Sequence, residues 1–104
     1  MMILSTTLEI PGRKIKKVLG VVKGNTVRTR WIGINIIAGL RTLIGGEIPE
    51  YSDLLVKARE EAQKRMEDEA KKLGADAVVN VRFTISEVLQ SVIEILAYGT
   101  AVKF

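Results

Sequence analysis

The sequence predicts a small α+β domain, in which a mostly antiparallel sheet packs against one long amphipathic helix. Three observations support this class. Residues 52–73 carry apolar side chains at helical spacing, Gly74 then stops that pattern, and the residues after Val79 alternate between apolar and polar. With 104 residues, the chain is predicted to form a single domain over residues 1–104.

The N-terminal part is predicted to contribute short strands. Residues 3–7 read as one strand, and Pro11-Gly12 as the turn that follows it. Residues 15–22 are apolar on both faces at their centre, which favours a strand covered on both sides. Gly24-Asn25 is then expected to form a turn that leads into residues 26–29.

A shorter helix is predicted at about residues 34–44. Apolar residues recur there at spacings of three and four, although Gly33 and Gly39 weaken the pattern. Gly45-Gly46 is expected to end this helix and to begin a loop.

The long helix at about residues 52–73 is the most clearly predicted element. Ser52 suits its N-cap, and Gly74 suits the left-handed position that closes a helix. One stripe is apolar, and it contains Leu54, Leu55, Ala58, Ala62, Met66, Ala70 and Leu73. The opposite face offers five acid–base pairs at i,i+4, namely Asp53–Lys57, Glu60–Lys64, Glu61–Arg65, Glu67–Lys71 and Asp68–Lys72. Each such pair stabilises an isolated helix by about 0.2–0.5 kcal/mol.

Two strands are predicted after this helix. Val79, Val81, Phe83 and Ile85 are expected to share the buried face of the first strand, with a turn near residues 87–90. Residues 92–104 form the second strand, and both of its faces are largely apolar. One helix covers only one face of a small sheet. We therefore expect a neighbouring subunit to cover the other face, in a homo-oligomer.

Composition excludes several kinds of chemistry. The chain has no Cys and no His, which rules out disulfides, serine–histidine or cysteine–histidine nucleophiles, and zinc sites of the common nitrogen and sulfur kind. We therefore expect a non-catalytic protein and not an enzyme. No stretch is long and apolar enough to cross a membrane, and the start lacks the pattern of a signal peptide, so we expect a cytoplasmic protein without membrane contact.

Three groups of charged residues are candidate sites. Glu47, Glu50 and Asp53 could ligate a hard metal ion through oxygen, or they could simply favour the positive end of the helix. Glu94, inside an apolar strand, is expected to lie diagonal to Arg82 and to form an ion pair within or between subunits. Residues 13–17, with Trp31 farther along, leave weak nucleic-acid binding open, although an edge strand protected by lysines is favoured.

The order of several motifs resembles that of the YbjQ family, also called UPF0145 and described as heavy-metal-binding. These motifs are Ser5-Thr6-Thr7, residues 19–24, residues 40–46 with Tyr51, residues 57–62, residues 73–79 and residues 98–102. The resemblance covers nearly the whole chain. It implies a ring-like homopentamer of small α+β subunits packed round an axis, and it assigns no ligand residues.

The metal-binding description meets a chemical difficulty in this chain. Soft metal ions prefer thiolate and imidazole ligands, and this sequence offers neither. The sequence thus predicts a binding or assembly role with no required cofactor, and it leaves a metal ion held by oxygen ligands as an alternative. A nucleic-acid partner is not favoured, and the identity of any small ligand stays open.

Overall fold

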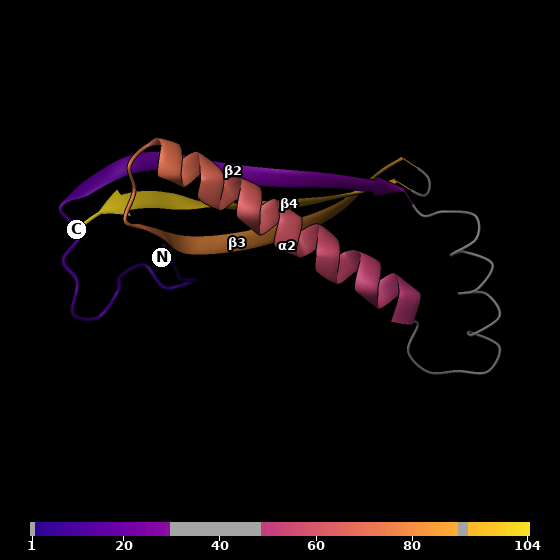
Figure 1. The fold of residues 1–104 in the computed structure, drawn as a ribbon, viewed down its shortest axis with the longest axis horizontal. Coiled ribbons are helices and arrows are strands. Elements are labelled where there is room, and N and C mark those ends of the chain that lie inside the picture. The colour runs from indigo at the N-terminus through magenta and orange to yellow at the C-terminus, as the bar shows by residue number, and fades with distance from the viewer. Residues whose placement is uncertain (1, 30–48, 90–91) are drawn as a thin grey trace.

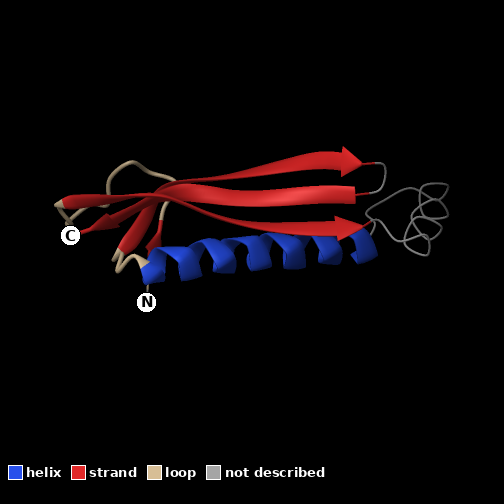
Figure 2. Cartoon of the chain, turned by 90° about the horizontal axis from the view of Figure 1, so that it is seen from above, coloured by secondary structure: helices blue, strands red, loops and turns tan. Residues whose placement is uncertain are grey.

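The computed structural model describes residues 2–29, 49–89 and 92–104. It consists of β1 (Ile3–Leu4), β2 (Lys17–Thr29), α2 (Pro49–Lys72), β3 (Ala77–Leu89) and β4 (Val92–Lys103). The strands form one mixed sheet in the order β1-β3-β4-β2, in which β1 is parallel to β3 and the other pairs are antiparallel. Figure 1 shows the three long strands side by side, and Figure 2 shows α2 along one face of the sheet. The predicted α+β class is confirmed, whereas the helix predicted at residues 34–44 lies outside the described residues.

The long helix ends as predicted but begins earlier. α2 starts at Pro49, so Ser52 lies inside the helix and the prediction that it is the N-cap was wrong. Proline suits a first helical turn because the N–H it lacks has no partner there. At the other end, Gly74 has a φ of 78°, and the N–H of Ala75 donates to the carbonyl of Ala70 at 3.1 Å. Gly74 therefore closes the helix in the left-handed conformation that the sequence predicted.

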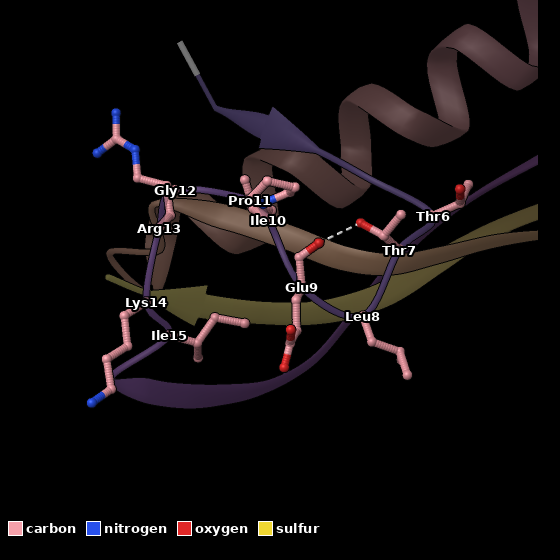
Figure 3. A pocket seen from close by; sticks show the side chains of 10 residues that line it. All are labelled: Thr6, Thr7, Leu8, Glu9, Ile10, Pro11, Gly12, Arg13, Lys14 and Ile15. Carbon is pink, nitrogen blue, oxygen red and sulfur yellow. Dashed lines mark hydrogen bonds between the residues drawn. The ribbon is translucent and has the colours of Figure 1, made fainter.

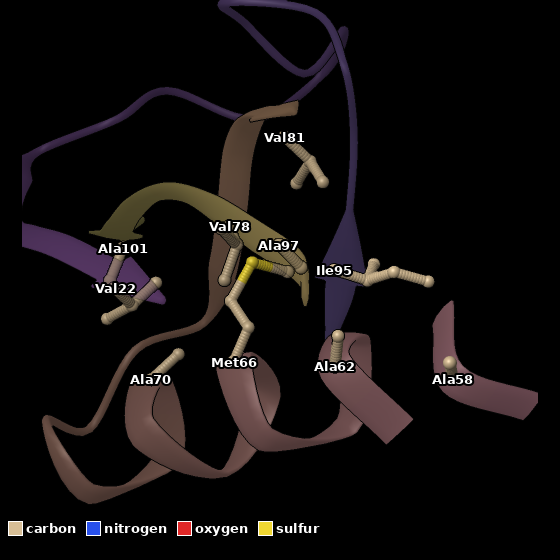
Figure 4. Packing of buried hydrophobic residues seen from close by; sticks show 10 residues of the cluster. All are labelled: Val22, Ala58, Ala62, Met66, Ala70, Val78, Val81, Ile95, Ala97 and Ala101. Carbon is tan, nitrogen blue, oxygen red and sulfur yellow. The ribbon is translucent and has the colours of Figure 1, made fainter. Parts of the chain in front are cut away.

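A core of small and aliphatic side chains lies between α2 and the sheet. Figure 4 shows Met66 extending from the helix toward Val78 and Ala97 of the sheet. The helix contributes Ala58, Ala62, Met66 and Ala70, all of them fully buried. Because three of these four are alanines, the helix backbone can approach the strands closely. Leu73, which was predicted to join this stripe, is 47% exposed because it follows the last residue of α2.

β2 is one continuous strand, so the turn predicted at Gly24-Asn25 was wrong. Every residue from Gly20 to Thr29 has a partner on β4. Gly24 is needed because α2 passes directly over it: a Cβ there would overlap the carbonyl oxygen of Ala62 and the backbone nitrogen of Met66. Glycine inside a strand can mark either a turn or the close approach of another backbone, and the second applies here.

β3 contains a bulge that the sequence pattern did not reveal. Its pairing with β4 shifts between Val79 and Arg82, and Asn80 has a φ of 53°. The extra residue changes which side chains share a face. Val81 therefore joins the core under α2, whereas Val79 packs on the opposite face with Ala77 and Val102. The prediction that Val79, Val81, Phe83 and Ile85 share one buried face was wrong.

β4 is the central long strand, between β3 and β2, and it matches the predicted closing strand. Its side chains alternate between buried and half-buried. Ile93, Ile95 and Ala97 are buried, and Ile95 and Ala97 belong to the core that α2 covers. β3 continues through Leu89 and β4 begins at Val92, so the strands extend into the region predicted as a turn.

Candidate functional site

The N-terminal segment after β1 continues along the outer edge of β3, beside its bulge. The N–H of Asn80 donates to the carbonyl of Thr7, and that of Val81 donates to the carbonyl of Ser5, both at 2.9 Å. The chain then turns over the far face of the sheet, where Ile10 and Ile15 pack against Val79 and its buried neighbours. The segment is therefore anchored to the sheet at both of its ends.

This segment encloses an open hollow of about 1200 Å³, lined by residues 6–15. Figure 3 shows that the polar ends of Glu9, Arg13 and Lys14 point away from one another. The Thr7 hydroxyl donates to the carbonyl of Glu9 at 2.6 Å, so it is engaged within the segment itself. A small-molecule site normally brings a few polar groups together in a concave pocket. The polar side chains that line this hollow do not converge in that way.

The structure describes the backbone of Glu50 and Asp53 from the predicted carboxylate site, but not Glu47. Glu50 and Asp53 both belong to the first turns of α2, and Asp53 is exposed. Glu47 lies outside the described residues. Across residues 2–29, 49–89 and 92–104, no three Asp, Glu, Cys or His side chains gather closely enough to hold a metal ion. The assignment of Glu47, Glu50 and Asp53 to a metal site stays a prediction.

Glu94 has a different partner from the one predicted. The carboxylate oxygen Oε2 of Glu94 accepts a hydrogen bond from the side-chain amide of Asn25 at 3.1 Å. Arg82 lies opposite Tyr98, and Glu94 lies opposite Ser86, so the two charged residues are four positions apart along β4 and β3. In the part of the chain that the structure describes, they form no ion pair within the subunit. A pair between subunits stays a prediction.

An arginine cluster, Arg28–Glu61–Arg65, connects α2 to β2. Glu61 forms ion pairs with both arginines. Arg65 also donates to the backbone carbonyl of Asn25 at 2.6 Å, and Arg28 donates to the carbonyl of Val27 at 3.5 Å. The cluster thus occupies backbone acceptors along β2, which is an edge strand.

The sequence predicted one contact of this cluster and missed the other. Glu61–Arg65 is one of the five i,i+4 pairs expected on α2. The second partner of Glu61 is Arg28, which is 33 residues away in the sequence. No local pattern connects residues that far apart. Farther along the helix, Lys64 pairs with Asp68 at 3.7 Å instead of with Glu60.

The predicted basic stretch lies at one end of the sheet. Lys17 begins β2 and sits directly opposite Lys103, near the end of β4. The backbone N–H of Lys16 donates to the carbonyl of Lys103 at 2.8 Å. The guanidinium of Arg13 lies over the ring of Phe104, 5.4 Å from its centroid. Trp31, the proposed aromatic partner of this stretch, lies outside the described residues.

Comparison with known proteins identifies relatives over almost the full length. A sequence model of a family described as "Putative heavy-metal-binding" (YbjQ_1) matches residues 2–104. A UPF0145 protein of Archaeoglobus fulgidus is 56% identical over 101 residues, which cover 97% of this chain and 94% of that protein. A UPF0145 protein of Thermus thermophilus is 55% identical over 104 residues, covering 99% of this chain and 91% of that protein.

A solved structure supports the fold. A protein of unknown function from Pediococcus pentosaceus, assigned to the DUF74 family, superposes with a TM-score of 0.68. The match covers 99% of this chain and 97% of that one, at 17% identity, so it bears on the fold alone. No helix within the described ranges has the length and apolar character needed to cross a bilayer.

Proposed function

The chain belongs to the YbjQ (UPF0145) family, and from this premise we propose that it is a non-catalytic, cytoplasmic homo-oligomer with a binding or assembly role. The observation that carries the proposal is the outer edge of β3 between Arg82 and Leu89. β1 pairs only with Ala77 and Val78, and the last hydrogen bond from the N-terminal segment reaches Val81. Among the described residues, none pairs with β3 beyond that point on this edge.

The far half of β3 also exposes apolar side chains. Phe83 is 41% exposed, Ile85 58%, Val88 56% and Leu89 67%. α2 packs mainly over β2 and β4, so it leaves the helix side of β3 uncovered, where Phe83 and Ile85 lie. Fully burying a side chain of this size stabilises an assembly by about 1.5–3 kcal/mol. An open strand edge with apolar side chains is a typical docking site for another chain.

The two edges of the sheet differ in a way that supports this assignment. The outer edge of β2 is interrupted by a bulge between Val18 and Gly20. Farther along, the arginine cluster occupies the carbonyls of Asn25 and Val27. Bulges and charged side chains are two devices by which edge strands avoid pairing with other chains. β3 is charged at Arg82 and Glu87, and its pairing with β4 shifts again between Glu87 and Leu89. Between Phe83 and Ser86, however, the pairing is regular and no side chain is charged, so this stretch of the edge has neither device.

A second copy of the chain is the partner we propose. The sequence predicts a subunit contact because the strands carry more apolar surface than one helix covers, and it predicts that contact on the face opposite the helix. Phe83 and Ile85 lie instead on the helix side, at the β3 edge, and we propose the contact there. The family resemblance implies five copies in a ring. A ring needs a heterologous contact, in which the β3 edge of one subunit meets a different surface of the next. Arg82 and Glu94 form no ion pair with each other among the described residues, and Glu94 accepts a hydrogen bond from Asn25. Arg82, on β3 itself, is the residue we propose for an ion pair across that contact.

Native mass spectrometry and light scattering at micromolar concentration test this proposal. We expect a mass of several subunits for the natural chain, and five is the number that the family resemblance implies. Ile85→Lys places a charge on the β3 edge and should shift the mass to the monomer. Val21→Lys is the matched control, because Val21 is 71% exposed on β2 and lies away from the β3 edge. A monomeric natural chain would refute the oligomer, whereas an oligomeric Ile85→Lys variant would refute the β3 contact alone.

Metal binding through oxygen ligands is the second candidate, and the description of the family as heavy-metal-binding favours it. Glu47, Glu50 and Asp53 are the ligands we propose, because they are closely spaced carboxylates near the start of α2. Carboxylates suit hard cations such as Mg²⁺ and Ca²⁺ better than soft heavy metals. Calorimetric titration with Mg²⁺, Ca²⁺ and Mn²⁺ should then show binding that the triple Glu47→Gln, Glu50→Gln, Asp53→Asn variant loses. The absence of binding heat with all three ions would exclude this candidate.

A further inference from the structure

One end of the molecule collects basic residues from four segments. The chain enters β2 there, β4 and α2 both end there, and β3 begins there. The hydrogen bond from the N–H of Asp76 to the carbonyl of Val102, at 2.9 Å, holds the end of the helix region against the end of β4. We call this surface the basic end, and it consists of Arg13, Lys14, Lys16, Lys17, Lys71, Lys72 and Lys103.

The register of the sheet places two of these lysines directly opposite each other. Lys17 of β2 pairs with Lys103 of β4, and both side chains are exposed. Like charges at directly opposed positions destabilise a pair of strands. A lysine on the edge strand β2 discourages pairing with other chains, which explains Lys17. Edge protection does not explain Lys103 on the central strand β4, so its charge is left for a role outside the fold.

Few acidic groups compensate the basic end. The carboxylate of Asp76 accepts a hydrogen bond from the backbone N–H of Phe104 at 2.9 Å. Glu9 is near in the sequence, and Glu67, Asp68 and Glu69 lie about one helical turn before Lys71 and Lys72. The middle of the molecule differs, because Arg28 and Arg65 share Glu61 there and Lys64 pairs with Asp68. The basic end therefore keeps more bases than acids, and it carries part of the net charge of +4.

We propose that the basic end binds the phosphate backbone of nucleic acid without reading its sequence. Lysines and arginines that neutralise phosphates supply most of the affinity in this mode of binding. The side chains of Arg13 and Lys14 extend outward from their loop, as Figure 3 shows. The surface is larger than the stretch at residues 13–17 that the sequence singled out, because folding adds Lys71, Lys72 and Lys103 to it.

Nucleic acid fits this surface better than an anionic membrane does. Surface-bound proteins usually insert an amphipathic helix with one apolar and one basic face. The apolar face of α2 is buried against the sheet, and its outer face carries acids such as Glu60 among its bases. The basic end itself is built from strand ends, a loop and one helix end, whose charges can contact a phosphate backbone without burial in lipid.

Fluorescence anisotropy with a labelled 20-base-pair DNA duplex and a labelled 20-nucleotide RNA tests the proposal. We expect binding at 50 mM salt, and for about six phosphate contacts we expect affinity to fall roughly 10³-fold between 50 and 200 mM salt. The Lys17→Ala, Lys103→Ala double variant should bind more weakly, and its slope of log K against log salt should be smaller by about two. Lys57→Ala with Arg59→Ala removes the same charge from exposed positions on α2 and should leave that slope unchanged.

A further variant separates lost binding from lost folding. Lys103→Glu turns the opposed pair into an attractive one, so its melting temperature should rise above that of the natural chain while its nucleic-acid affinity falls. No binding of the natural chain at 50 mM salt would overturn the proposal, as would an equal effect of the α2 control variant. Binding to vesicles containing phosphatidylserine, without binding to DNA or RNA, would assign the surface to membranes instead.

Discussion

Gly24 of β2 lies against Ala62 of α2 with no space for a side chain between the two backbones. A Cβ at Gly24 would overlap the carbonyl oxygen of Ala62, and it would come within 2.7 Å of the Cβ of Arg65. This contact sets the distance between the helix and the sheet. It also explains how the carbonyl of Asn25, the next residue, comes within hydrogen-bond distance of Arg65.

We expect Gly24→Ala to destabilise the protein by about 3 kcal/mol, the upper end of the range for overpacking. The added methyl group meets helix backbone, which cannot move aside as a flexible side chain would. Urea denaturation followed by circular dichroism measures the change in unfolding free energy. Val21→Ala, on the exposed face of the same strand, is the control and should change stability by less than about 0.5 kcal/mol. A loss below 1 kcal/mol for Gly24→Ala would show that the helix can retreat from the strand.

Met66 is the largest fully buried side chain among the described residues, and its removal should be among the most costly core substitutions there. We expect Met66→Ala to cost about 2–5 kcal/mol, because the alanines around it cannot fill the cavity. Met66→Leu conserves volume and should cost less than about 1.5 kcal/mol. Val56→Ala is a control on the same helix, where Val56 is 41% exposed. Equal losses for Met66→Ala and Val56→Ala, measured by urea denaturation, would contradict the burial of Met66.

The elements that the sequence predicted well are those with a regular local pattern. α2 follows from its apolar stripe and its closing Gly74, and β4 follows from its apolar run. The failures come from tertiary contacts. Gly24 was interpreted as a turn because the approach of Ala62, 38 positions later, leaves no mark near Gly24 in the sequence. The alternation from Val79 to Ile85 assumed an unbroken strand, and the left-handed Asn80 between them reversed the faces.

The candidate sites follow the same rule. The stretch at residues 13–17 was visible as a run of bases, whereas its continuation through Lys103 depends on strand register. Glu94 was recognised as unusual, but its partner Asn25 lies 69 residues away on the other neighbouring strand. Local spacing therefore identifies which residues need a partner, and only the fold identifies the partner.

The Thr26 hydroxyl forms a buried hydrogen bond that joins β2 to α2. It donates to the carbonyl of Ala58 at 2.7 Å, and Thr26 is 1% exposed. Thr26→Val keeps the shape and removes the donor, so we expect a loss of about 0.5–1.5 kcal/mol. Thr26→Ser is not a suitable control, because it keeps the hydroxyl but also loses a buried methyl group. The control is Thr6→Val in the exposed N-terminal segment, away from the proposed contact on β3. A similar loss there would show that the Thr26 bond contributes nothing specific.

Asn80 occupies a backbone conformation that suits glycine, and its side-chain oxygen Oδ1 is buried without a hydrogen-bond partner among the described residues. Asn80→Gly removes both the left-handed strain and the unpaired acceptor. We therefore expect it to leave stability unchanged or to raise it by up to about 1 kcal/mol. Asn80→Val puts a β-branched residue at positive φ and should cost about 1–2 kcal/mol. Urea denaturation measures both changes in unfolding free energy. A valine variant as stable as the glycine variant would mean that the bulge does not hold position 80 in the left-handed region.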